Sequence, residues 1–120
     1  MKHPSIIRSF SHAFNGINTF FSGDRNGRIH LAIAVWVSVA GFYFELSVTE
    51  WILLLLCFAL VLSLEMMNHA LEDVCDTIQT VYHPMIKKAK DVSAAAVLWS
   101  AIIAAIIGSL IFIPKILAIL

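Results

Sequence analysis

Residues 51–76 read WILLLLCFALVLSLEMMNHALEDVCD, and this stretch decides the fold. It is apolar or nearly so as far as residue 64, and it then carries four polar residues at spacings of 3, 4 and 4: Glu65, Asn68, Glu72 and Asp76. At about 100° per residue, a helix places these four side chains within roughly 80° of one another. An ionisable group inside an apolar segment is costly in a bilayer and by default marks a functional site. The stripe is therefore expected to face protein or a water-filled cavity.

The composition is that of an integral membrane protein. Of the 120 residues, 60% are hydrophobic and 13% are charged, and the mean hydropathy is +0.88. Soluble domains carry about 25% charged and about 45–50% apolar residues. The length fits a single domain over residues 1–120. The formal net charge is zero, so no basic patch points to a nucleic acid partner.

The apolar pattern predicts an all-α membrane protein with an N-terminal amphipathic surface helix and three transmembrane helices. Residues 4–22 carry apolar side chains on one helical face, which is typical of a helix lying along a membrane surface. The third span is expected to stop at Pro114, because proline disrupts a helix interior. Allowing for a cytoplasmic extension of the second helix, we expect the spanning helices at about residues 28–45, 51–80 and 92–113.

The distribution of basic residues predicts the orientation in the membrane. Lysines and arginines precede the first span and lie between the second and third, whereas residues 46–50 contain none. The positive-inside bias places the N-terminus in the cytoplasm. As a helix, residues 51–64 cover about 21 Å of a hydrocarbon core about 30 Å thick. Glu65 is therefore expected within the cytoplasmic half of the bilayer, and Glu72 and Asp76 at its interface.

Two observations predict a homo-oligomer. Three spans are few to enclose a polar site. The third span also carries small residues, which let helices approach closely in lipid; they are Ser93, Ala94, Ala95, Ala96, Ala101, Ala104, Ala105 and Gly108.

The expected cytoplasmic end combines acids with an amide and a lysine. Carboxylates there can hold Mg²⁺, which prefers oxygen ligands and keeps phosphates and waters as partners. A carboxylate at the membrane boundary can also take a proton from a lipid hydroxyl. The sequence has no Walker A pattern and no kinase Gly-rich loop with a catalytic HRD motif. A bound nucleotide is therefore not expected to be held as it is in soluble kinases.

Three motifs follow one another along the chain: D-R-N-x-R-I-H at residues 24–30, E-x-x-N-x-A-x-E-x-x-x-D at residues 65–76, and A-K-D-x-x-A-A-A-V at residues 89–97. Together they resemble the signature of the prokaryotic diacylglycerol kinases and undecaprenol kinases, in which the first motif usually begins with Glu. The resemblance covers nearly the whole chain. It implies a homotrimer of three-span subunits in the bacterial inner membrane. It also implies Mg²⁺- and ATP-dependent phosphorylation of a lipid alcohol, undecaprenol or diacylglycerol, at the cytoplasmic face.

The resemblance further implies a role for each matching residue. Glu65 would be the catalytic carboxylate that accepts the lipid hydroxyl proton, and Asn68 would orient Glu65 or the γ-phosphate. Glu65 and Ala94 would contact the lipid substrate. The metal ligands would be Asp24 and Glu72, which also belong to the nucleotide site together with Tyr82, His83, Lys90 and Asp91.

Two departures from the family pattern leave room for a catalytically impaired homologue. Asp24 is one methylene shorter than the usual Glu, so a metal would have to lie closer to the backbone or be reached through water. His69 stands where a small Ser or Thr is common, beside Asn68.

An alternative from another class is a small oligomeric transporter in which the intramembrane Glu65 couples protons to an exported compound. Small multidrug exporters share this size and a buried acid. They have four spans, however, and do not require an acidic stripe together with Lys90 and Asp24 at one face of the membrane.

Overall fold

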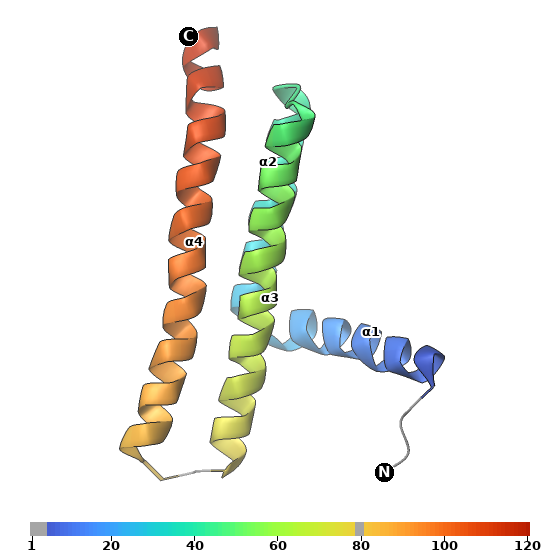
Figure 1. Ribbon diagram of the computed structural model, residues 1–120, viewed down its shortest axis with the longest axis vertical. Coiled ribbons are helices and arrows are strands. Elements are labelled where there is room, and N and C mark those ends of the chain that lie inside the picture. The colour runs from blue at the N-terminus through green and yellow to red at the C-terminus, as the bar shows by residue number, and fades with distance from the viewer. Residues whose placement is uncertain (1–4, 79–80) are drawn as a thin grey trace.

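The computed structural model describes residues 5–78 and 81–120, and this part of the chain is built from four helices. Helices α2, α3 and α4 run side by side along the long axis, and α1 lies across them (Figure 1). The end where α3 leads into α4 extends beyond the level of α1 (Figure 1). The all-α prediction is confirmed; the helices are α1 (Ile6–Gly23), α2 (Arg25–Tyr43), α3 (Val48–Ile78) and α4 (Pro84–Ile119).

Asp24 forms the corner between α1 and α2. Its backbone N–H donates to the Phe20 carbonyl at 2.8 Å and closes α1. Its side-chain Oδ1 accepts from the Gly27 N–H at 3.2 Å and caps α2, as short acids commonly do. Arg28 Nη1 donates to two carbonyl oxygens in the last turn of α1, each at 3.0 Å. Because both helix ends are satisfied by neighbouring groups, the chain turns sharply here without a loop.

The same corner is packed by one aromatic ring. Phe20 is only 4% exposed, and its ring lies against Gly27, where a Cβ would come within 2.4 Å of it. Phe21 is half-buried against Phe20. The remaining large apolar side chains of α1 are exposed, and they form the unpartnered face expected of a surface helix; they are Ile6, Ile7, Phe10, Phe14 and Ile17.

The turn from α2 to α3 lies at the opposite end of the bundle from the α3–α4 connection (Figure 1). Glu45 adopts the left-handed conformation with φ 53°, and the Leu46 N–H donates to the Gly41 carbonyl at 3.2 Å. This is a Schellman ending, which satisfies carbonyls left open at a helix C-terminus. Leu46 is then buried with Leu54 of α3 and Ile111 of α4, so the turn also starts the hydrophobic core.

Helix α3 begins three residues before the predicted start at Trp51. Ser47 Oγ accepts from the Glu50 N–H at 3.2 Å, and Glu50 Oε1 accepts from the Ser47 N–H at 3.0 Å. This reciprocal capping box starts the helix at Val48. Pro4, the predicted first residue of the surface helix, and Thr80, the predicted last residue of the second spanning helix, lie outside the described residues.

Helix α4 is longer than predicted, and the interpretation that Pro114 ends it is wrong. The helix begins at Pro84, so it includes the basic stretch before the expected span, and it continues through Pro114 to Ile119. Proline removes one backbone donor, a loss that long apolar helices tolerate. The ion pair of Lys115 with Glu50 of α3, at 3.2 Å, ties the segment after the proline to its neighbour.

Two helices, α3 and α4, are long and apolar enough to cross a membrane. Helix α2 has 19 residues and is not one of these two, because its first turn is polar and leaves a shorter apolar run. Large apolar side chains are exposed along the described helices, for example Trp36, Leu56, Trp99 and Leu110. Such continuous apolar exposure is rare on soluble monomers and suits a lipid environment.

We predict that Gly27→Ala destabilises the α1–α2 corner by about 1–3 kcal/mol, the usual cost of overpacking. The new Cβ would collide with the buried Phe20 ring. Thermal unfolding in detergent measures the effect. The matched control is Gly16→Ala in α1, where nothing lies within 4 Å of the added Cβ. Equal melting temperatures for the two variants would contradict the packing role of Gly27.

Candidate active site

Glu65 is the most deeply buried charged side chain of the described residues, at 3% exposure in the middle of α3. Its Oε2 lies 3.9 Å from Nε2 of His30 on α2. The charges of Asp24 and Glu72 also act on its carboxylate. His30 is therefore the basic group that faces the buried acid.

Asn68 lies one turn after Glu65 and is 8% exposed. Its Oδ1 is buried and accepts no hydrogen bond from the part of the chain that the structure describes. A buried polar atom without a partner costs about 1–3 kcal/mol, so native structures rarely leave one without a ligand, water or ion. The orphaned amide oxygen therefore points to a bound species beside Glu65.

Asp24 reaches the same region from the α1–α2 corner. Its Oδ2 lies 3.2 Å from Nδ1 of His69 on α3. His69 Nε2 lies 3.5 Å from Asp73 Oδ2, one turn further along α3. The Phe20 ring meets the imidazole edge-on, with ring centroids 5.8 Å apart. His69 therefore contacts Asp24, rather than only standing beside Asn68 in the sequence.

Lys90 joins α4 to the acidic stripe of α3. Its Nζ donates to Asp76 Oδ1 at 2.8 Å, and the charge of Glu72 also acts on it. Both partners are partly exposed, at the end of the bundle that extends beyond α1. Glu72 thus lies between the Lys90–Asp76 pair and the buried Glu65.

The remaining predicted residues lie further from this cluster or face outward. Asp91 pairs with Lys87 on its own helix. His83 caps α4, because its Nδ1 accepts from the Met85 N–H at 3.1 Å. Tyr82 and Ala94 are exposed. The structure records no contact between these four side chains and Glu65.

The donor set suits a hard cation. Asp24, Glu65 and Glu72 supply carboxylate oxygens, and the unpartnered Asn68 Oδ1 supplies an amide oxygen, which are the ligand types that Mg²⁺ prefers. Among the described residues, no three His, Cys, Asp or Glu side chains are grouped closely enough to hold a metal ion by themselves.

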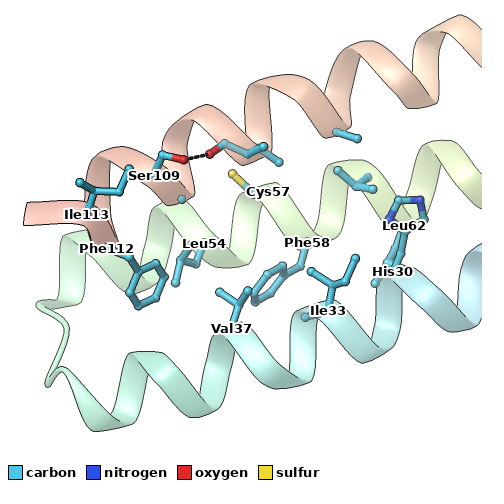
Figure 2. A pocket seen from close by; sticks show the side chains of 16 residues that line it. His30, Ile33, Val37, Leu54, Cys57, Phe58, Leu62, Ser109, Phe112 and Ile113 are labelled. Atoms are coloured by element: carbon cyan, nitrogen blue, oxygen red, sulfur yellow. Dashed lines mark hydrogen bonds between the residues drawn. The ribbon is translucent and has the colours of Figure 1, made fainter. Parts of the chain in front are cut away.

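An apolar cavity of about 450 Å³ lies between α2, α3 and α4 and ends at His30 (Figure 2). Figure 2 shows His30 and Leu62 at one end and Phe112 and Ile113 at the other. The lining residues 54–62 of α3 extend over about 12 Å at 1.5 Å per residue. The wall formed by α4 contains small residues, and its one hydroxyl, that of Ser109, donates to the Ala105 carbonyl at 2.8 Å. The cavity is therefore apolar over its length and polar only where it meets the Glu65 region.

His30 is the site residue whose position the sequence pattern did not reveal. It closes the first motif, and it is the residue that both contacts Glu65 and lines the cavity. The signal lay in the spacing: six residues after the Asp24 cap place His30 on the second turn of α2, at the level of Glu65.

Comparisons with known proteins agree with these features. The family described as prokaryotic diacylglycerol kinase matches residues 11–112. An undecaprenol kinase of Bacillus subtilis is 43% identical over 110 residues, which are 92% of this chain and 89% of the relative. A diacylglycerol kinase of Synechocystis is 38% identical over 98% of this chain and 67% of its own length. A diacylglycerol kinase of Escherichia coli K12 is 28% identical, with 84% and 83% of the two chains covered.

Proposed function

The chain belongs to the prokaryotic diacylglycerol kinase family, as the three sequence motifs predicted, and we propose that it transfers the γ-phosphoryl group of ATP to the hydroxyl of a membrane lipid alcohol. Undecaprenol and diacylglycerol are the candidate acceptors, since the relatives carry these two names. One observation carries the proposal: the buried Glu65 lies beside His30 at the polar end of an apolar cavity.

In this proposal the cavity receives a hydrocarbon chain of the lipid, and its polar end presents the hydroxyl to Glu65. The cavity volume of about 450 Å³ suits a hydrocarbon chain and is too small for a further helix. A helix with side chains is about 10–12 Å wide, so a 12 Å length of it fills roughly 900 Å³ or more, about twice the cavity volume. One hydrocarbon chain is much thinner than a helix. Glu65 accepts the hydroxyl proton, and His30 holds the carboxylate in place.

The nucleotide site is proposed at the junction of α3, α4 and the α1–α2 corner. Mg²⁺, when bound, offsets phosphate charge, and Asp24, Glu72 and the Asn68 amide oxygen are its proposed ligands. Lys90 binds phosphate after exchanging its contact with Asp76. Because phosphoryl transfer depends mainly on positioning and charge neutralisation, these groups suffice without a covalent step. Further contacts are proposed from Tyr82, His83 and Asp91 to the nucleotide and from Ala94 to the lipid.

The membrane arrangement is part of the proposal. We infer three spans, with α2 crossing alongside α3, and a cytoplasmic N-terminus in a bacterial inner membrane. The exposed apolar face of α1 suits a helix lying at the membrane surface, and the α3–α4 end extends beyond it (Figure 1). We further propose a homotrimer, in which the outward-facing residues of α4 meet the acids of a neighbouring subunit.

The direct test is incorporation of γ-phosphate from labelled ATP into lipid by the purified protein. We expect Mg²⁺-dependent labelling of undecaprenol or diacylglycerol, and a competition between the two identifies the preferred acceptor. A proton-coupled transporter would respond to a pH gradient and ignore ATP. Nucleotide binding without labelling of any lipid alcohol would indicate an impaired homologue and contradict the proposal.

We predict that Glu65→Gln lowers turnover by about 10²–10⁴-fold, the usual contribution of a general base. The amide keeps the shape of the side chain and cannot accept the proton, so ATP affinity should change little. Phosphate incorporation and ATP binding are measured on the same preparation. Glu45→Gln, in the exposed turn at the other end of α2, is the matched control. A parallel loss of ATP binding and turnover would argue against Glu65 as the base.

We predict that Lys90→Gln raises the KM for ATP about tenfold while leaving thermal stability within about 1 kcal/mol. A partly exposed ion pair such as Lys90–Asp76 contributes only about 0–1 kcal/mol to folding. Lys88→Gln, on the same helix and also exposed, is the control for loss of a positive charge. Equal effects of the two substitutions on KM would indicate general attraction of ATP instead of a specific phosphate contact.

A further inference from the structure

His69 occupies the space between the Asp24 corner and α3. Its Nδ1 lies 3.2 Å from Asp24 Oδ2, and its Nε2 lies 3.5 Å from Asp73 Oδ2. The Phe20 ring packs on the imidazole edge, and Phe20 in turn is held against Gly27. The imidazole is therefore located by packing as well as by its contacts with two carboxylates.

The Asp24 carboxylate is used at both oxygens. Oδ1 accepts from the Gly27 N–H at 3.2 Å, and Oδ2 faces His69. Capping a helix in this way requires a short side chain, and Glu is not among the favoured capping residues. An acid one methylene longer would also have to enter the space that the imidazole fills. The two unusual residues of this chain, Asp24 and His69, are therefore in contact and fit each other sterically.

We propose that His69 is a positioning residue that holds the Asp24 carboxylate in its metal-binding orientation. The Gly27 N–H restrains one oxygen and the imidazole the other, so the short acid cannot rotate away from the acidic cluster. Asp24 and His69 then act as a coupled pair. In this chain the pair takes the place of the Glu and the small Ser or Thr that are common at these two positions of the family pattern. This inference rests on the proposed function, because Asp24 is a metal ligand only if the kinase proposal holds.

The test is a double-mutant cycle in the full-length protein with His69→Ser, Asp24→Glu and the combined variant. Binding of Mn²⁺, as a probe for Mg²⁺, is followed by electron paramagnetic resonance without ATP or lipid. We expect each single substitution to weaken Mn²⁺ binding about five- to tenfold, and the double variant to regain most of the loss, since contacting residues couple in such cycles. In kinase assays, His69→Ser should raise the metal concentration for half-maximal rate with little change in kcat at saturating metal.

Two further variants separate positioning from general damage. His69→Asn places an amide N–H near the position of Nδ1 and should retain most of the Mn²⁺ affinity. His12→Ser makes the same loss of an imidazole on the exposed side of α1 and should have no effect. A His69→Asn variant as weak as His69→Ser would overturn the proposed role of the Nδ1 contact.

Thermal unfolding of the metal-free variants distinguishes failure of this inference from failure of the kinase proposal. Non-additive melting temperatures are expected, because the contact exists without metal. Additive effects in both unfolding and Mn²⁺ binding would overturn the coupling of Asp24 and His69. A wild-type protein that neither labels lipid nor binds Mn²⁺ would overturn the proposed function and, with it, the metal-positioning role, even if unfolding were non-additive.

Discussion

The burial of Glu65 in an apolar helix is the constraint on which the rest of the structure depends. A carboxylate that is 3% exposed needs polar neighbours, and it has His30 at 3.9 Å on α2. This requirement places α2 against the acidic side of α3. The position of the α1–α2 corner along α3 is linked to the same site, because Asp24, the N-cap of α2, contacts His69, which lies one turn after Glu65. A bilayer makes the constraint stronger, since lipid offers no water to satisfy the group.

The α1–α2 corner meets this constraint with very few residues. Asp24 ends one helix and caps the next, Arg28 satisfies carbonyls of α1, and Phe20 fills the space over Gly27. Helix α1, whose exposed apolar face suits a membrane surface, is thereby joined to α2, which runs along α3 (Figure 1). One of these side chains, Asp24, is itself a proposed metal ligand and also contacts His69, so local folding and site geometry are linked.

Four of the eight small residues that suggested close helix packing, Ala101, Ala104, Ala105 and Gly108, line the cavity beside α2 and α3. Their small side chains leave this space open between the three helices. The cavity ends at His30, and this residue lies 3.9 Å from the buried Glu65 carboxylate (Figure 2).

The sequence by itself determined the helical class, the approximate helices and the family, because apolar periodicity and motif spacing are local properties of the chain. The acidic stripe of α3 follows from helical spacing alone, and its first two members, Glu65 and Asn68, are indeed buried. The ends of the helices were predicted less well. The Ser47–Glu50 capping box starts α3 earlier than predicted, and α4 continues through Pro114 to a segment that the Lys115–Glu50 pair joins to α3.

Only the tertiary structure decided which side chains meet across helices. His30 facing Glu65, His69 facing Asp24 and Lys90 facing Asp76 join residues 35, 45 and 14 positions apart, and their meeting depends on how whole helices pack. The cavity is likewise a property of three helices together. Periodicity specifies the faces of each helix separately, whereas the distance and rotation between helices are set by many side chains at once, so the contacts that define the site had to come from the folded chain.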